Sequence, residues 1–144
     1  MGVRVQVRAE SSLGPFWLES AAVANSGFES DEPVCSLPAA AAERLGWWPN
    51  LPPQAVIYPF LTYGGTVNVP AIPSGLRVRV LAPGRAPKEV LATAVISTTD
   101  NEIVLNDGLV AELSIVLVDT RRGTWCFRDE PMTPGRPSEP AQYW

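Results

Sequence analysis

The chain contains no histidine. This absence excludes Ser-His-Asp and Cys-His catalysis, because both need an imidazole as the general base. Only two cysteines are present, Cys35 and Cys126, which are too few and too far apart in sequence for a zinc cluster. In an ordinary cytosol we expect two buried thiols, whereas in a hyperthermophile an internal disulfide between them is plausible.

The sequence also lacks an apolar run of membrane-spanning length and a secretory type of leader. We therefore expect a cytoplasmic protein without a membrane partner. The formal net charge is −4, and the acids are scattered with no basic stripe among them. Nucleic acid is not an expected partner, because binding to a phosphate backbone needs clustered cations.

What is present is the composition of a folded protein. The 144 residues are 46% hydrophobic and 18% charged, which suits one domain with a substantial core. We expect this domain over residues 1–127. A tail over residues 128–144 is rich in proline and polar residues, so we expect it to be extended or mobile.

Short apolar runs separated by turns predict a fold made mostly of strands. Val3, Val5 and Val7 alternate with polar residues, as in a half-buried strand. The Gly64-Gly65 pair between two apolar runs predicts a hairpin. One helix is predicted over about residues 38–45, where a proline precedes four alanines. About eight strands and one short helix predict an all-β fold, a small closed or strongly curled β-barrel.

The order of these pieces resembles the retropepsin-like aspartic proteases. Asn25-Ser26-Gly27-Phe28 follows an apolar strand where that family carries Asp-Thr/Ser-Gly, and "SLPAAAAERLG" follows as in many cellular members. Tyr63-Gly64-Gly65-Thr66 stands where the family has its flap, and residues 102–127 are similar to the family's closing segment. The resemblance covers most of residues 1–127. It implies a retropepsin-type barrel and a homodimer with its site on the two-fold axis, without cofactor or metal.

The same resemblance assigns the candidate site. It places Asn25, Ser26 and Gly27 at the catalytic position, and it implies that Phe28 and the residues from Tyr63 to Thr66 contact an extended peptide. Aspartic proteases need two carboxylates about 3 Å apart that share one proton. An asparagine amide cannot take a proton from water. We therefore expect a catalytically silent site in which Ser26 and Gly27 keep their structural tasks.

Asn25 leaves further interpretations open. The chain could be an active type of aspartic endopeptidase whose asparagine was engineered, or one in which the Asn-Ser step deamidates slowly to a carboxylate. It could also be a small β-barrel structural or interaction protein without a peptide cleft. A second departure from the family pattern is Asn106, which stands after Val104-Leu105 where members have a glycine.

Other acids and aromatic residues have simpler interpretations. Asp119-Thr120 resembles Asp-Thr-Gly, but Arg121 follows, so we expect a surface turn. We expect the remaining loop acids to be solvated rather than catalytic or calcium-binding: Glu29, Asp31, Glu32, Asp100, Glu102 and Asp107. We assign Trp125 and Phe127 to sheet packing, and we expect Tyr63, next to the glycine pair, to meet a ligand.

Overall fold

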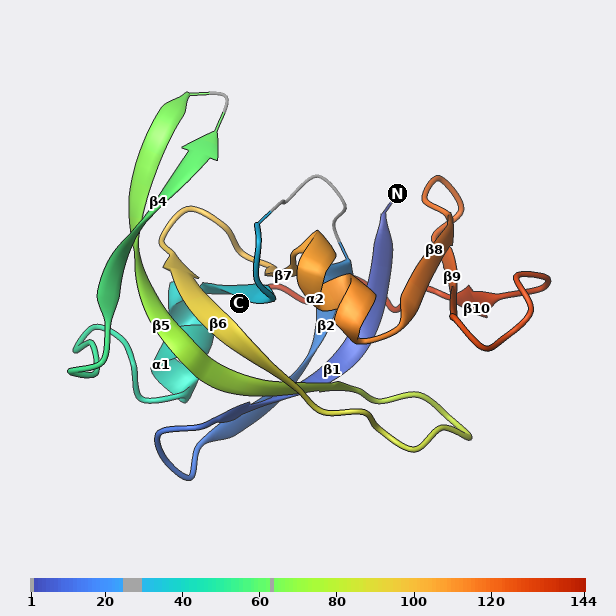
Figure 1. Ribbon diagram of the computed structural model, residues 1–144, viewed down its shortest axis with the longest axis horizontal. Helices are drawn as coiled ribbons and strands as arrows, with labels where there is room; N and C mark the ends of the chain where they lie inside the picture. The colour runs from blue at the N-terminus through green and yellow to red at the C-terminus, as the bar shows by residue number, and fades with distance from the viewer. Residues whose placement is uncertain (1, 25–29, 63) are drawn as a thin grey trace.

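A computed structural model describes residues 2–24, 30–62 and 64–144, and for residues 60–62 it describes the backbone only. The fold is mostly β with two short helices (Figure 1). The elements in chain order are β1 (Val3–Ser11), β2 (Trp17–Ala24), β3 (Val34–Pro38), α1 (Ala39–Arg44), β4 (Val56–Thr62), β5 (Gly65–Val80), β6 (Val90–Ser97), β7 (Ile103–Leu105), α2 (Asp107–Glu112), β8 (Ile115–Asp119), β9 (Thr124–Phe127) and β10 (Arg136–Pro137).

Six strands close into a barrel. Their order is β1-β2-β7-β3-β6-β5, and β5 pairs again with β1, for example Val7 with Val80. Two of the pairings, β2 with β7 and β3 with β6, are parallel, while the others are antiparallel. The predicted small closed barrel is therefore confirmed.

Strand β1 shows why the sequence folds this way. Val3, Val5, Val7 and Ala9 are at most 1% exposed, and the residues between them are half-buried. Because successive side chains of a strand point to opposite faces, the alternation in the sequence becomes the inner and outer faces of the barrel wall. The inner face joins one continuous hydrophobic core.

The prediction of a single helix was wrong. The alanine-rich helix α1 forms as expected after Pro38, but a second helix, α2, follows β7. Asn106 begins α2 as its N-cap, with the side-chain oxygen accepting from the backbone N–H of Leu109. Neither helix, nor any other helical segment in the described part of the chain, is long and apolar enough to cross a membrane.

The hairpin β4–β5 extends beyond the barrel. In the described part of the chain β4 pairs only with β5, from Val56 opposite Ala71 to Thr62 opposite Gly65. We call residues 56–70 of this hairpin the hairpin arm, which rises at the upper left of Figure 1. An irregularity between Ile72 and Leu76 separates the arm from the part of β5 that pairs with β1.

The segment after β9 lies along the barrel. Strand β10 pairs with β9 in a second sheet of three strands. Beyond it, Glu139 donates its backbone N–H to the carbonyl of Arg4, and the Trp144 indole N–H donates to Ser20 Oγ over 2.9 Å. The tail is therefore extended and attached to the body of the protein.

Both cysteines are buried and unpaired, as expected for two thiols in a core. Cys35 faces the interior from β3, and burial raises the pKa of its thiol to about 12. A thiol with so high a pKa stays protonated near neutral pH and is a poor nucleophile.

Candidate functional site

The predicted site residues fall in two parts of the molecule. Asn25, Ser26, Gly27 and Phe28 lie outside the described residues, between the end of β2 at Ala24 and the segment that leads into β3, and Tyr63 also lies outside them. Gly64, Gly65 and Thr66 lie at the tip of the hairpin arm and are exposed. Gly65 has a φ of 105°, a backbone conformation that glycine adopts without strain.

The segment just after the Asn-Ser-Gly sequence is bound by Asn106. This side chain is fully buried and makes three hydrogen bonds. Its Oδ1 accepts from the N–H groups of Val34 (2.9 Å) and Leu109 (2.8 Å), and its Nδ2 donates to the carbonyl of Glu32 (2.8 Å). Asn106 thus ties the start of β3 to the junction between β7 and α2.

Gly108 brings the same two segments into close approach. A Cβ built on Gly108 would lie 3.1 Å from the carbonyl oxygen of Glu32. A side chain at this position would therefore push α2 away from the Glu32 segment. The "NDG" sequence at residues 106–108 combines a cap, an acid in the first turn and a residue without a side chain.

The hairpin arm reaches the same segment from another side. The Tyr58 hydroxyl donates to Oε1 of Glu32 over 3.0 Å. This hydrogen bond and the nearby acids raise the pKa of Tyr58, because they stabilise the protonated phenol. Tyr58 and Glu32, which the sequence offered as separate residues, are a bridge between the arm and the barrel.

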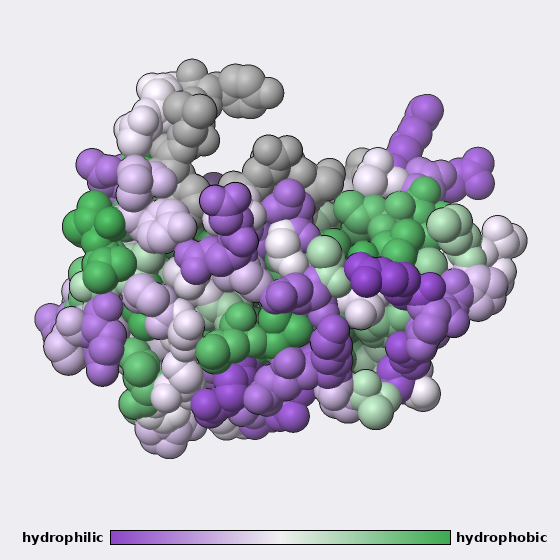
Figure 2. Space-filling view, viewed as in Figure 1, coloured by the Kyte–Doolittle hydropathy of each residue, from purple (hydrophilic) through white to green (hydrophobic). Residues whose placement is uncertain are grey.

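A small hydrophobic cluster lies beneath this bridge, apart from the main core. Val34, Ala71 and Val95 are its buried members, and Tyr58 and Val69 pack against them. We call these five residues the arm cluster. Val67, two residues before Val69 on the same face of β5, continues this apolar face toward the tip and is 45% exposed. In Figure 2 the upper end of the arm projects at the upper left, while its lower part lies against the rest of the molecule.

Three of the other acids have structural partners, and one of them, Glu102, was wrongly expected to be solvated; Glu29 lies outside the described residues. Asp119 accepts the N–H groups of Arg121 and Arg122, which confirms a surface turn. Glu102 pairs with Arg4 at 2.7 Å, and Asp107 accepts the N–H of Gly108. Within the described ranges, no group of three or more His, Cys, Asp or Glu side chains is arranged to hold a metal ion.

The aromatic residues near the end of the barrel domain pack in its interior. Trp125 and Phe127 are nearly buried, and their rings meet edge to face with centroids 5.1 Å apart, which confirms their role in sheet packing. Trp47 is also buried. Among the tyrosines, the described contact with the candidate site comes from Tyr58.

Two features of the site were missed in the sequence. Asn106 was noted only as a departure from glycine, although its position before an acid and a glycine at the start of an apolar segment is a helix N-cap signal. The pairing of Tyr58 with Glu32 has no local signal, because 26 residues separate the partners.

The chain was compared with known proteins. No protein-family model matches it, and no curated protein matches it either.

Proposed function

We propose that this chain is an aspartic-peptidase-like protein of the retropepsin type that no longer catalyses peptide hydrolysis and instead binds an extended peptide between two copies of itself. The observation that carries the proposal is that two separate elements bond to residues Glu32–Val34, a segment that begins five residues after Gly27 in the sequence. Asn106 of the closing segment and Tyr58 of the hairpin arm both bond to this short stretch. These are the three pieces that the family resemblance expects around one site.

The arm cluster supplies the wall for such a ligand. Its partly buried members Tyr58 and Val69 lie on the arm, and Val34 begins β3 next to Glu32. An extended peptide beneath the arm would rest an apolar side chain here, while its backbone hydrogen-bonds to the chain around Gly64 and Gly65. Phe28 and Tyr63 are the further contacts that we propose.

The proposed lack of catalytic activity follows from Asn25. General base catalysis needs a carboxylate to take the proton of the attacking water, and an amide has no comparable basicity. In a symmetric homodimer both halves of the site would carry the amide. The arm and the partly buried side chains Tyr58 and Val69 remain as a surface for a ligand, so we propose binding as the present function.

A paired assay tests the proposal. The protein and its Asn25→Asp variant are incubated with an unstructured protein substrate from acidic to neutral pH, with and without a transition-state analogue of aspartic proteases. Asn50→Asp is the matched control, because it adds the same charge on an exposed loop far along the chain. We expect cleavage only with Asn25→Asp, and we expect the inhibitor to stop it.

Binding is tested on the unmodified sequence by NMR titration with a library of extended peptides, and dimerisation by sedimentation. We expect shifts at Gly64, Gly65, Thr66 and the arm cluster. Folded protein in which peptides leave these signals unchanged, and in which Asn25→Asp stays inactive, would instead indicate a structural barrel without a peptide cleft.

A further inference from the structure

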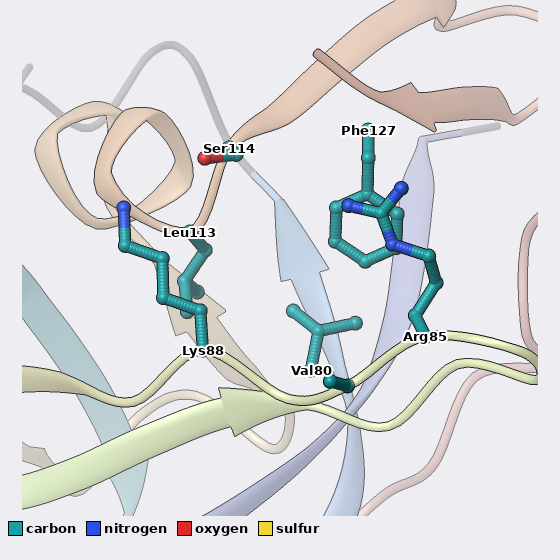
Figure 3. A pocket seen from close by; sticks show the side chains of 7 residues that line it. Val80, Arg85, Lys88, Leu113, Ser114 and Phe127 are labelled. Carbon is teal, nitrogen blue, oxygen red and sulfur yellow. The ribbon is translucent and has the colours of Figure 1, made fainter. Parts of the chain in front are cut away.

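A small pocket lies at the opposite end of β5 from the hairpin arm. It is lined by Val80, Arg85, Ala86, Lys88, Leu113, Ser114 and Phe127, and its volume is about 60 Å³ (Figure 3). These residues come from the end of β5, the loop before β6, the end of α2 and strand β9. None of them takes part in the site proposed above.

The floor of the pocket is apolar and its rim is cationic. Val80, Leu113 and Phe127 are nearly buried, whereas Lys88 is exposed. Arg85 stacks over the Phe127 ring at 4.4 Å and pairs with Asp129 at 2.6 Å, so an acid already offsets its charge. Lys88, the only lysine of the sequence, forms no ion pair with any acid in the described part of the chain.

Ser114 occupies an unusual backbone conformation at this pocket. Its φ is 62°, directly after the C-cap of α2, where glycine or asparagine is the ordinary residue. A serine keeps a hydroxyl at this position at the cost of backbone strain, and such strain is concentrated at functional sites. In Figure 3 the Lys88 side chain rises from its loop toward the end of the helix, and the Ser114 hydroxyl is turned toward the Lys88 side.

The loop between β5 and β6, which contains Arg85 and Lys88, is anchored to the rest of the protein without a ligand. Arg136 donates from Nη1 to the carbonyl of Pro83 over 3.4 Å and forms a bidentate pair with Glu130. The pair between Arg85 and Asp129 fixes the same loop to the segment after β9. Binding therefore needs little ordering of the loop around Pro83 and Arg85, which lowers the entropic cost of holding even a small ligand.

Size and chemistry together define that ligand. A water-sized group occupies roughly 10 to 15 Å³ on this measure, so the pocket has room for about four to six heavy atoms. A free ammonium and a hydroxyl suit a carboxylate. The buried walls suit one or two carbon atoms attached to it.

We propose that this pocket binds a small carboxylate on a short apolar stem, with Lys88 and Ser114 holding the carboxylate and Val80, Leu113 and Phe127 enclosing the stem. A free short-chain acid and the terminal carboxylate of a peptide that ends in alanine share this chemistry. Propionate and N-acetylalanine are the probes that represent the two sources.

Lys88 gives the test a specific reporter. Reductive methylation with ¹³C-formaldehyde retains the charge and labels this side chain and the terminal amine, which resonate separately. We expect propionate to shift the Lys88 signal and the amides of Ala86, Leu113 and Ser114 saturably, with Kd in the millimolar range. Propionamide, which has the same shape without the charge, should bind at least tenfold more weakly. A tighter Kd for N-acetylalanine than for propionate would indicate a peptide terminus as the source.

Variants separate the site from general charge effects. We expect Lys88→Met to weaken propionate binding about tenfold or more, Lys88→Arg to retain most of it, and Ser114→Ala to weaken it severalfold. Arg121→Met removes an equal charge from an exposed turn and should change nothing. Equal binding of propionate and propionamide, unchanged binding by folded Lys88→Met, or no saturable shift in the wild type would each overturn the proposal.

Discussion

The two halves of strand β5 differ sharply, although one continuous strand of 16 residues contains both. In the described part of the chain, the first part of β5, from Gly65 to Pro70 in the hairpin arm, pairs only with β4, and its residues from Gly65 to Asn68 are exposed. The second half pairs with β1 on one side and β6 on the other, and it buries Leu76 and Val78 completely. One strand thus serves both as a wall of the barrel and as an arm outside it.

This difference suggests separate roles for the two parts of β5: the barrel part stabilises the fold, and the arm part is suited to binding. Residues with neighbours on both sides contribute most of the burial that stabilises the fold. Residues with one neighbour can move or be substituted with little loss of stability, so they are suited to contact a ligand. Two links meet at the segment around Glu32: the Asn106 hydrogen bonds tie it to the barrel, and the Tyr58 hydroxyl ties it to the arm.

The largest effect is expected where the barrel-side link is removed. Asn106→Ala leaves the buried N–H groups of Val34 and Leu109 and the partly buried carbonyl of Glu32 without their partner. We expect the free energy of unfolding to fall by about 3 to 4 kcal/mol. Urea denaturation measures this change. Asn101→Ala, at an exposed position, should cost less than about 0.5 kcal/mol.

An Asn106→Ala variant as stable as Asn101→Ala would mean that water replaces the amide. In that case the start of β3 would not depend on this link, and the barrel would hold the Glu32 segment by other contacts.

The same substitution in each half of β5 compares them directly. Val78 is 0% exposed in the barrel and Val67 is 45% exposed in the arm. We expect Val78→Ala to lower the free energy of unfolding by about 2 to 3 kcal/mol through lost burial and a cavity, and Val67→Ala to lower it by about 0.5 kcal/mol or less. Chemical denaturation of both variants gives the difference. Similar costs would show that the arm is as much a part of the core as the barrel.

The arm-side link is weaker and depends on pH. We expect Tyr58→Phe to cost about 0.5 to 1 kcal/mol, because it removes one partly buried hydrogen bond to Glu32. The folded pKa of Tyr58 is raised, so its contribution is present in full below the ordinary tyrosine pKa and is lost as pH rises through the folded value. Hydrogen exchange of the arm amides should be faster in Tyr58→Phe at neutral pH, and the advantage of the wild type in urea denaturation should vanish or reverse in alkali, where a phenolate would face Glu32. An advantage of the wild type that persists there would mean that it does not come from the protonated hydroxyl donating to Glu32.

Three elements were predictable because each has a signal within a few neighbouring residues. They are the alternating valines of β1, the alanine-rich helix and the glycine-containing hairpin. Pairing of β2 with β7, and of β3 with both β6 and β7, has no such signal, since the partners are distant in sequence. Helix α2 had a local signal at Asn106, yet the short apolar segment after it suits a strand equally well.

Within the candidate site, the sequence identified the individual residues better than their contacts. Glu32 was named only as a solvated acid, and it is the fold that places its Oε1 3.0 Å from the hydroxyl of Tyr58 on the hairpin arm. The same limit applies to the Lys88 pocket, whose walls come from four separate elements. Chemistry that depends on long-range pairing is visible only when the register of the strands is known.

The smallest effect is expected beyond the barrel end of β5, where the loop before β6 is tied to the segment after β9. Glu130 accepts from Arg136 and from the N–H of Phe127, and these bonds lower the pKa of its carboxyl to about 2. Because the folded pKa lies below the unfolded one, this contribution is present above about pH 4.5 and is lost as pH falls toward 2. We expect the wild type to lose its small advantage in Tm over Glu130→Gln across this acidic window, as measured by thermal melts at matched ionic strength. The difference should be slight, because the carboxylate lies near the surface and water screens its ion pair.

A difference in Tm between the two proteins that stays the same from pH 6 to pH 2 would contradict this expectation. It would mean that packing of Phe127 and Trp125 alone holds the segment after β9. The loop with Arg85 and Lys88 would then owe its position to contacts other than the pair of Glu130 with Arg136.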